Sequence, residues 1–396
     1  MSAELVRLED LVVGDISYGI VQPGGEVQGG IPILRVGDIE TGVVNTRSPL
    51  SVAPSIAAGF QRTQLMGGEV LVTLVGTVGR IAIAPTRVAG WNVARAIAVL
   101  RPKPDIAADW LALSLSSPDV QGQISSLLNT TVQPTLNLKD LRAIWVRVPL
   151  ERERRAIGEV LGALDDKIAA NSNLSRTLND LAAEYFSQSV QAAGEGPTYG
   201  NIADVFGGGT PSTKIDEYWG GEIRWATPTD VTALEAPYLE DTSRHLTSAG
   251  LAACASELHP AGSILMTSRA TIGAFALAGG PTAVNQGFIV VRPKDSQLDM
   301  WLFHEMQSRV SDYLAVANGA TFLELSRGRF KTMPVRWAPE DVMRRFGAIA
   351  RPLHGRARAA MHESRSLAAL RDTLLPELMS GRLQIKDAER AVEEAL

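Results

Sequence analysis

The chain has 396 residues, 45% hydrophobic and 20% charged, a composition that predicts a globular protein with room for two or three domains. Its formal net charge of −5 excludes a uniformly basic nucleic-acid-binding protein, so any contact with DNA must use local patches. No apolar run approaches the ~18 residues of a membrane span, the N-terminus is polar and acidic, and the single cysteine excludes an internal disulfide. We therefore expect a cytoplasmic protein without membrane contact.

Residues 1–150 are predicted to form a first strand-rich domain. Short apolar runs bounded by Gly, Pro and Asn predict strands at 30–36, 69–75, 80–84, 94–100 and 144–148. Helices are expected at 110–115 and 120–128, with a helical turn at 138–141. This mixture predicts an α+β domain.

Residues 151–193 are predicted to form one long helix, because they contain no proline and carry a heptad pattern. The residues that recur every seven positions are Ile157, Leu164, Asn171, Leu178 and Tyr185. The intermediate positions of the seam are assigned to Leu161, Ile168, Leu174 and Leu181. A seam of this length predicts a coiled-coil helix of about 60 Å.

Residues 194–338 repeat the strand-rich pattern, after a segment, 194–197, that we interpret as a linker. Residues 339–381 repeat the long helix, and 382–396 form a C-terminal tail. The second seam contains Phe346, Leu353, Ala360, Leu367 and Leu374. Pro352 and Gly355 are expected to weaken its first turns, and Pro376 with Gly381 to mark its end.

The chain is a duplication. Residues 68–79 match 262–273 at an offset of 194, and 109–111 match 300–302 at an offset of 191. Asn129 matches Asn318, and Leu136 matches Leu325, at an offset of 189. This period is too long for a solenoid repeat and indicates a duplicated globular unit with a pseudo-twofold relation. The two long helices, with net charges of −2 and +2, are expected to bury each other's seams, in either a parallel or an antiparallel pair.

Residues for catalysis are scarce. The chain has no dinucleotide fingerprint and no H-E-x-x-H motif, and its five histidines and one cysteine form no metal-binding pattern. The glycine-rich segment 207–214 lacks the Gly before Lys214 that a phosphate loop requires, although its backbone N–H groups and hydroxyls would suit a DNA phosphate. A plain turn explains this segment equally well. We therefore expect no catalytic residues and no metal site.

Several polar residues are candidates for DNA contacts, each with a structural alternative. Arginines beside the repeated turns could bind guanine or phosphate, but solvated surface arginines are as common. Trp219 and Trp225 could stack on bases, but core packing is the more common fate. Asp38 and Asp230 match across the repeat and are interpreted as turns or caps after a strand. The candidate DNA-binding residues are Arg35, Thr77, Arg80, Ser212, Lys214, Arg224 and Arg269.

The order of these motifs resembles the specificity subunits of type I restriction–modification systems. Residues 14–24 followed by 30–39 look like the opening of one subtype of their target-recognition domain. Residues 208–212, then 218–219 and 223–231, look like another subtype of the same domain. The resemblance covers essentially the whole chain, and the two subtypes imply two different half-site sequences.

The resemblance implies a non-catalytic reader of DNA with two tandem recognition domains, 1–150 and 194–338. Each would read half of a split double-stranded DNA target, and the two long helices would pack antiparallel and set the gap. Two modification subunits would methylate adenine N6 with S-adenosylmethionine, and two restriction subunits could add cleavage that uses ATP and Mg²⁺. The helix-pairing and partner-docking residues would be Ile157, Leu164, Leu178, Tyr185, Phe346, Leu353, Leu367 and Leu374.

Two other functions compete with this one, and the residues leave the second of them open. A methyltransferase that carries its own recognition domain would need an S-adenosylmethionine loop and an Asn/Asp-Pro-Pro-aromatic motif, and neither is present. A coiled-coil scaffold with two protein-binding domains would fit the acidic second domain, whose net charge is −4. Sequence-specific DNA binding would distinguish a reader from a scaffold.

Overall fold

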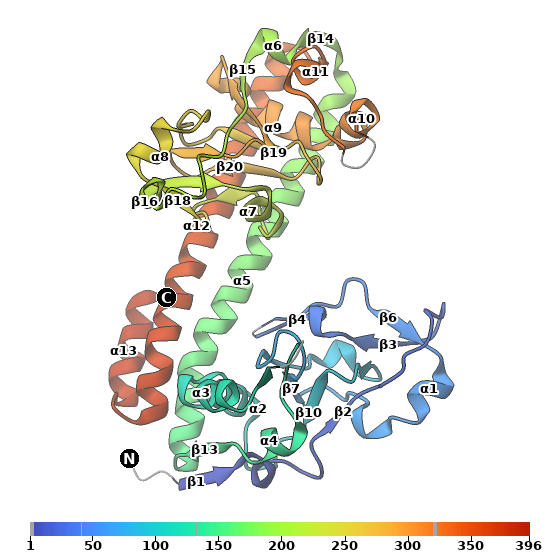
Figure 1. The fold of residues 1–396 in the computed structure, drawn as a ribbon, viewed down its shortest axis with the longest axis vertical. Helices are drawn as coiled ribbons and strands as arrows, with labels where there is room; N and C mark the ends of the chain where they lie inside the picture. The colour runs from blue at the N-terminus through green and yellow to red at the C-terminus, as the bar shows by residue number, and fades with distance from the viewer. Residues whose placement is uncertain (1–3, 41, 131–132, 320–322) are drawn as a thin grey trace. The chain divides into compact units, whose positions relative to one another are not determined.

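The computed structural model describes residues 4–40, 42–130, 133–319 and 323–396. Contacts divide the chain into two compact units, of which unit 1 comprises residues 1–169 and 364–396 and unit 2 comprises residues 170–363 (Figure 1). Each unit holds one strand-rich region and half of each long helix. The predicted fold class, two strand-rich α+β regions with two long helices, is confirmed.

Unit 1 is built around an antiparallel four-stranded sheet with strand order β2-β10-β7-β8. These strands are Ser17–Tyr18 (β2), Val70–Thr73 (β7), Ile81–Ile83 (β8) and Ile97–Leu100 (β10). Alternate residues of β7 enter two different cores, because Val70 and Val72 pack with Trp110 whereas Leu71 packs on the other side. Burial on both faces explains why this strand reads as an unbroken apolar run.

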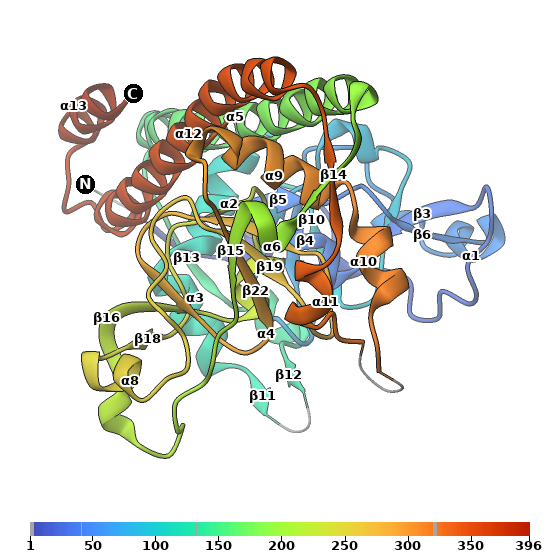
Figure 2. The ribbon, with the colours of Figure 1, turned by 90° about the horizontal axis from the view of Figure 1, so that it is seen from above.

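Shorter elements complete unit 1. A three-stranded sheet consists of Ile31–Leu34 (β3), Leu50–Val52 (β6) and Asn92–Val93 (β9). Three strand pairs are Glu4–Arg7 (β1) with Trp145–Val148 (β13), Ile39–Glu40 (β4) with Val43–Val44 (β5), and Asn129–Thr130 (β11) with Pro134–Thr135 (β12). The short helices are Pro54–Ala58 (α1), Ala108–Ser116 (α2), Pro118–Ser126 (α3) and Leu138–Arg142 (α4), with α4 beside β11 and β12 (Figure 2). Every predicted strand and helix of residues 1–150 contains or overlaps an observed one.

Unit 2 repeats this plan with a five-stranded sheet of order β15-β22-β19-β20-β17. Its strands are Ala203–Phe206 (β15), Tyr238–Leu239 (β17), Ile264–Thr267 (β19), Phe275–Ala278 (β20) and Phe288–Pro293 (β22). A second sheet contains Trp219–Ala226 (β16), His245–Leu246 (β18) and Thr282–Val284 (β21). The helices are Tyr199–Ile202 (α6), Pro228–Thr232 (α7), Ser248–Ala252 (α8), Asp299–Gln307 (α9), Val310–Val316 (α10) and Arg327–Lys331 (α11).

Each strand-rich region is closed by a ribbon between its first and last strands. In unit 1, β1 pairs antiparallel with β13, which directly precedes the first long helix. In unit 2, Gly194–Thr198 (β14) pairs antiparallel with Pro334–Trp337 (β23). The interpretation of 194–197 as a linker was therefore wrong. Gly196 permits the pairing, because a Cβ there would lie 2.3 Å from the Cβ of Trp337.

The long helices, Glu151–Ser189 (α5) and Glu340–Ser380 (α12), run antiparallel within each unit. In unit 1, Asp165 pairs with Arg371 at 2.7 Å, and the carbonyl of Ile168 accepts a hydrogen bond from Ser364. In unit 2, Asn171 donates to Glu363, and the rings of Phe186 and Phe346 meet edge to face with centroids 5.4 Å apart. In both cases the residue number rises along α5 as it falls along α12, which settles the direction that the pattern left open.

The seam of α5 differs from the prediction in its second half. Leu181 and Tyr185 are 41% and 39% exposed, whereas Ser175, Ala182 and Phe186 are buried. The intermediate seam positions observed in the structure continue in seven-residue steps from Leu161 and Ile168 to Ser175 and Ala182. The last two have small side chains. Leu174 and Leu181 were assigned to the seam because their side chains are apolar. Small residues fit here because the facing part of α12 is also rich in buried alanines, so the two backbones approach closely.

Most of the other predicted seam residues lie in the cores. The buried ones are Ile157, Leu164, Phe346, Leu367 and Leu374, and the partly buried ones are Leu178 and Leu353.

Helix α12 continues through both of its prolines. The first turns that Pro352 and Gly355 were expected to weaken are helical, and the helix passes Pro376 before Gly381 ends it with a φ of +75°. The segment predicted as a C-terminal tail, 382–396, contains a further helix. Residues Ile385–Ala395 form α13, whose Ala388 and Val392 are buried in the core of unit 1.

Candidate nucleic-acid interface

The hairpin turn that joins β7 to β8 recurs between β19 and β20 with the same hydrogen bonds. Gly79 donates its N–H to the carbonyl of Thr73, and Gly273 donates to that of Thr267, both at 2.9 Å. The hydroxyl of each threonine also accepts the N–H of the residue that follows the turn, at 3.0 Å for Thr73 and 2.9 Å for Thr267. The sequence repeat at 68–79 and 262–273 is therefore a repeat of backbone geometry.

A second chain segment is bonded to each turn in the same way. In unit 1, Leu136 donates to the carbonyl of Leu74, and Gly76 donates to that of Pro134. In unit 2, the corresponding donors are Leu325 and Ala270, and their acceptors are Ser268 and Leu323. The distances range from 2.9 to 3.2 Å. Each turn is thus held against a neighbouring segment, which comprises β11 and β12 in unit 1 and residues on either side of 320–322 in unit 2.

One position in this turn is strained in unit 2 alone. Gly76 has a φ of +77°, and its counterpart Ala270 has a φ of +58°. Among the described residues, Ala270 is the one non-glycine residue with a positive φ. The left-handed conformation costs a residue with a Cβ about 1–2 kcal/mol, and such strain is concentrated at functional sites.

Two further loops join each turn and form a continuous edge. The N–H of Leu74 bonds to the carbonyl of Ala96, and the N–H of Ser268 bonds to that of Gly287, each at 2.7 Å. Beside these loops, a Cβ at Gly19 would lie 1.8 Å from a carbonyl oxygen, and one at Gly208 would lie 2.1 Å from the matching oxygen. Close backbone packing therefore requires the glycine in the 207–209 segment. We call the repeated set of loops the tip edge: 18–21, 74–80, 94–96 and 133–136 in unit 1, and 207–210, 268–274, 285–287 and 323–325 in unit 2.

The tip edge of unit 1 carries uneven charge. Thr77 is exposed at the turn, whereas the guanidinium of Arg80 turns inward and donates to the carbonyl of Ile39 at 3.0 Å. Arg35 lies elsewhere, held by Asp38 and the carbonyl of Ser48.

Arg95 was missed in the sequence. Its side chain is exposed on the 94–96 loop, and no described residue pairs with it.

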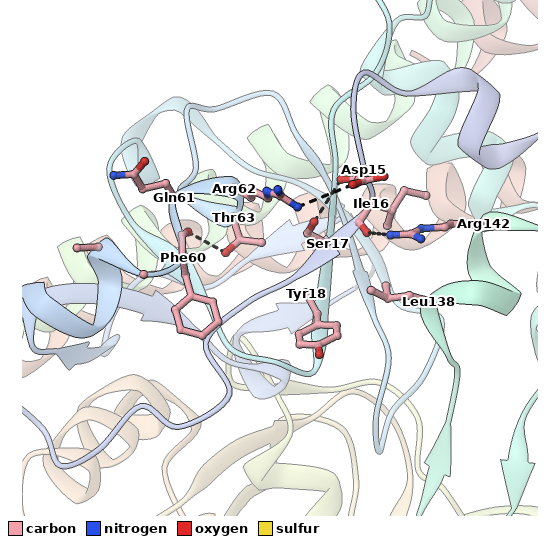
Figure 3. Close-up of a pocket in the computed structure, with 12 residues that line it drawn as sticks. Asp15, Ile16, Ser17, Tyr18, Phe60, Gln61, Arg62, Thr63, Leu138 and Arg142 are labelled. Atoms are coloured by element: carbon pink, nitrogen blue, oxygen red, sulfur yellow. Dashed lines mark hydrogen bonds and ion pairs between the residues drawn. The ribbon is translucent and has the colours of Figure 1, made fainter.

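A cavity of about 430 Å³ lies next to this edge, between β2, α4 and residues 58–63 (Figure 3). Tyr18 and Phe60 turn their rings to the same side of it, and Arg62 reaches toward Asp15, with the charged groups 3.8 Å apart. Arg142 lines the opposite wall and donates to the carbonyl of Ile16 at 2.8 Å. The combination of rings and guanidinium groups suits contact with a polyanion that carries flat bases.

The tip edge of unit 2 contains one arginine, Arg269, and a basic helix, α11, follows its last loop. Arg269 is 46% exposed and forms an ion pair with Glu324 at 2.8 Å, so its charge is largely offset. The guanidinium of Arg327 lies against Gly207, where a Cβ would be 3.3 Å from its Nη1. Arg329 and Lys331 follow on the same short helix, α11, exposed and without a partner among the described residues. The alternating signal Arg-Gly-Arg-Phe-Lys could have identified this cluster.

The other candidates of unit 2 lie along neighbouring loops. Ser212 and Lys214 are exposed, and Ser212 accepts the backbone N–H of Lys214 at 3.4 Å. Arg224 lies on β16 with its guanidinium close to Gly280, and Trp219 of the same strand donates its indole N–H to the carbonyl of Ser212 at 3.2 Å. Arg269 therefore lies within the tip edge, Arg327 lies beside it against Gly207, and Arg224 lies on a strand outside it.

The tryptophans and the repeated aspartates have structural roles. Trp225 is buried and packs edge to face on Trp219, with ring centroids 5.0 Å apart, and Arg244 stacks on Trp219 at 3.4 Å. Asp38 accepts the backbone N–H of Arg35, and Asp230 accepts that of Thr227, each at 2.8 Å at the start of a short helical turn, which confirms the cap interpretation. Partial burial favours the protonated form of Asp230, but hydrogen bonds from Thr227 and Ser243 prevail and lower its pKa.

A buried polar cluster in unit 2 ties the long helices to the sheet. His304 and His354 meet through their Nε2 atoms at 2.9 Å, and the Nδ1 of His354 lies 2.8 Å from the hydroxyl of Tyr238, which also donates to Asn179. Burial lowers the pKa of His304 to about 3 and that of His354 to about 4. Both imidazoles are therefore neutral near pH 7, and the cluster serves packing.

Within the described residues, no group of three or more His, Cys, Asp or Glu side chains could hold a metal ion. None of the helices described combines the length and apolar character needed to cross a bilayer.

Comparison with known proteins identifies the family. The sequence profile of the type I restriction modification DNA specificity domain matches residues 25–180 and again residues 198–339. The chain belongs to this family. Each match contains one copy of the repeated turn, 68–79 or 262–273, so the family resemblance stated from the motifs is confirmed.

Individual relatives are similar over part of their length. The specificity subunit of the type I restriction enzyme MjaIX from Methanocaldococcus jannaschii is 40% identical over 144 residues, which cover 36% of this chain and 33% of that protein. The EcoBI specificity subunit from Escherichia coli is 31% identical over 180 residues, which cover 45% of this chain and 37% of that protein. The matched region thus spans about a third of these curated relatives.

The fold as a whole has a counterpart among solved structures. The S subunit of a type I restriction–modification system from M. genitalium aligns with a TM-score of 0.57 at 15% identity, over 96% of each chain. The specificity-domain fold therefore extends across both units.

Proposed function

We propose that this chain is the DNA-reading subunit of a type I restriction–modification complex, and that each unit reads one half of a split double-stranded target. The observation that carries this proposal is the tip edge, which occurs twice with the same hydrogen bonds in a chain that matches the specificity-domain family twice. The loops within the two edges differ in sequence, so the two half-sites are expected to differ.

The tip edges make the first contact with DNA in this proposal. The exposed cations Arg95 in unit 1 and Arg327, Arg329 and Lys331 in unit 2 would bind phosphates and set the register. Side chains of the turns, among them Thr77 and Arg269, would reach the base edges in a groove. The few basic groups fit a reader that shares phosphate neutralisation with a partner.

The chain would act without chemistry of its own. Two modification subunits would dock on it and methylate adenine N6 with S-adenosylmethionine, and two restriction subunits, where present, would use ATP and Mg²⁺ for cleavage. The long helices would set the gap between the half-sites and carry the docking surfaces. The domain assignment 1–150, 151–193, 194–338, 339–381 and 382–396 would then correspond to reader, spacer, reader, spacer and a C-terminal segment.

The proposal is tested by mapping adenine methylation through single-molecule sequencing of cells that express this chain together with its modification partner. We expect one split motif, with two short sequences at a fixed gap, that disappears in cells with the partner alone. A methylation pattern that is unchanged without this chain would refute the reader function. A stable complex with the partner that methylates no motif would favour the scaffold alternative.

A further inference from the structure

Unit 1 contains an open groove between its first long helix and the loop that leads into α2. The groove has a volume of about 550 Å³, and residues 104–109 form one wall while residues 151–166 of α5 form the other. Gly158 and Gly162 lie one helical turn apart on its floor. A Cβ on either glycine would meet no atom within 4 Å, so the floor is open to a second backbone.

The groove is acidic. Asp105, Asp109, Glu151 and Asp166 line it, and among the described residues no ion pair holds the carboxylates of Asp105, Asp109 and Asp166. Glu151 interacts electrostatically with Arg155. A fifth carboxylate, Glu159, is already paired with Arg155 at 2.8 Å.

The other arginine of the groove is also occupied. Arg154 donates to the carbonyls of Pro149 and Asp105, at 3.2 and 2.9 Å. The lining of the groove thus holds five carboxylates and two guanidinium groups, which leaves an excess of three negative charges on one concave surface.

The duplicated position in unit 2 shows what kind of group fills such a groove. At the repeat offset of 189, Gly158 corresponds to Gly347, and Gly162 corresponds to Arg351. The guanidinium of Arg351 binds the carboxylate of Asp299 at 2.7 Å and the carbonyl of Ser296 at 3.3 Å.

This counterpart is also narrower. A Cβ at Gly347 would lie 3.2 Å from the carbonyl oxygen of Gln297, whereas the same test at Gly158 finds open space. Unit 2 therefore fills and closes its groove with its own arginine, and unit 1 has glycine at that position.

We propose that the groove of unit 1 receives an arginine or lysine side chain from a helix of the modification subunit. This inference rests on the proposed function, which supplies the partner. The occupant is a basic helix because the glycines on α5 allow close helix approach, the excess of carboxylates in the groove favours a cation, and the repeat places a guanidinium at the same position. The two units thus present unequal docking grooves, and one of two docking events depends on a cation from the partner.

The test alters the groove of unit 1 in two ways. Gly162→Arg gives unit 1 the arginine that unit 2 has at 351, and Asp105→Asn with Asp166→Asn removes two unpaired carboxylates while keeping their shape. Asp180→Asn, an exposed carboxylate on the same helix outside the groove, is the matched control. Purified modification subunit is titrated onto each full-length variant at low and high salt, and native mass spectrometry counts the bound copies.

The wild-type protein should bind two modification subunits with two distinguishable affinities. The affinity of the unit 2 site should depend less on salt concentration than that of the unit 1 site. Gly162→Arg and the Asp→Asn pair should each weaken one of the two binding steps by about tenfold at low salt, and the Asp→Asn pair should flatten its salt dependence. The Asp180→Asn control should match wild type. Circular dichroism checks that Gly162→Arg folds, and the Asn variants decide the matter if it does not.

Two outcomes overturn the inference in different ways. If wild type binds the modification subunit and neither groove variant alters affinity or salt dependence, the groove is not the docking site and the proposed function stands. If wild type binds no modification subunit, the proposed function fails, and this inference fails with it.

Discussion

Ala270 holds a backbone conformation that its counterpart Gly76 adopts without steric cost. Its N–H donates to the carbonyl of Leu323, so the hydrogen bond to the neighbouring segment requires the left-handed φ whatever the side chain. The two turns therefore have the same hydrogen bonds but different backbone strain, because one has glycine and the other alanine at this position. Strain that is retained at an exposed tip points to a use for the methyl group in contact with a ligand.

Ala270→Gly should stabilise unit 2 by about 1 kcal/mol, because relief of the strained φ outweighs the added flexibility of the unfolded chain. The reciprocal change, Gly76→Ala, should destabilise unit 1 by about the same amount. Chemical denaturation followed by fluorescence measures both. Equal stability of both variants and wild type would mean that the positive φ at Ala270 costs nothing.

Charge at the unit 2 tip edge gives a second residue-level prediction. Arg327→Ala and Arg329→Ala should weaken DNA binding and lower the slope of log affinity against log salt by about one unit for each phosphate contact that is lost. Glu324→Gln should act in the opposite direction, because it removes the carboxylate that offsets Arg269. Fluorescence anisotropy over a salt series measures all three, with Glu217→Gln as an exposed control. A Glu324→Gln variant that binds more weakly would place Arg269 outside the interface.

The buried histidines predict how stability depends on pH. Because burial keeps the pKa of His304 at about 3 and that of His354 at about 4, the folded protein stays neutral at these groups while the unfolded chain gains protons below about pH 6.5. The contribution of the two histidines to stability is thus complete above pH 6.5 and falls as the pH drops toward 4. Thermal denaturation should show a lower Tm at about pH 5 than at neutral pH, with a shallower slope in His304→Phe. A Tm that does not change over this range would contradict the assignment.

At the scale of elements, the long helices show how far a heptad pattern carries. The period, the length and the duplicated seam of α5 and α12 were predictable, because apolar residues at seven-residue steps have one physical explanation. The second half of the α5 seam was not predictable from apolar residues. Its buried residues, Ser175 and Ala182, are small, and they let the two helix backbones approach closely. A search for apolar residues alone selected Leu181, which the structure exposes.

Two neighbouring residues test this seam. Ala182→Leu should destabilise the protein by about 1–3 kcal/mol, because it adds volume to a buried position between the helices. Leu181→Ala should change stability by no more than about 0.5 kcal/mol, since an exposed side chain buries little area. Equilibrium unfolding by urea compares the pair. A larger loss of stability at Leu181 than at Ala182 would support the seam predicted from the sequence, in which Leu181 faces the partner helix.

The candidate interface was predictable in part. Arg80 and Arg269 flank a turn whose repetition was evident in the sequence, but the direction of each guanidinium depends on groups far along the chain, Ile39 and Glu324, that no local pattern identifies. Arg95 was missed because it stands alone in its loop. The strand at 194–198 was missed for a similar reason, since Gly and Pro in that segment usually indicate a turn and its partner lies at 334–337.

At the scale of the whole molecule, the duplication gives the proposed function two copies of one reading fold in a single chain. In the proposed function, α5 and α12 set the gap between the half-sites. Insertion of seven residues into both helices at matched seam positions should preserve the pattern and lengthen the preferred gap by a fixed number of base pairs. Methylation mapping of the variant measures the gap. An unchanged gap in an active complex would reject the helices as the spacer.

The division of the chain between the units also sets an order of completion during synthesis. Unit 2 is one continuous stretch, 170–363, whereas unit 1 needs residues 364–396, which add Leu367, Leu374, Ala388 and Val392 to its core. The part of the protein that leaves the ribosome first is therefore the last to be finished. Domains commonly mature from the N-terminus onward, but here the first half of α5 must wait, with its seam exposed, until the final helices emerge. A chain that stalls before residue 364 would hold a complete unit 2 and an incomplete unit 1.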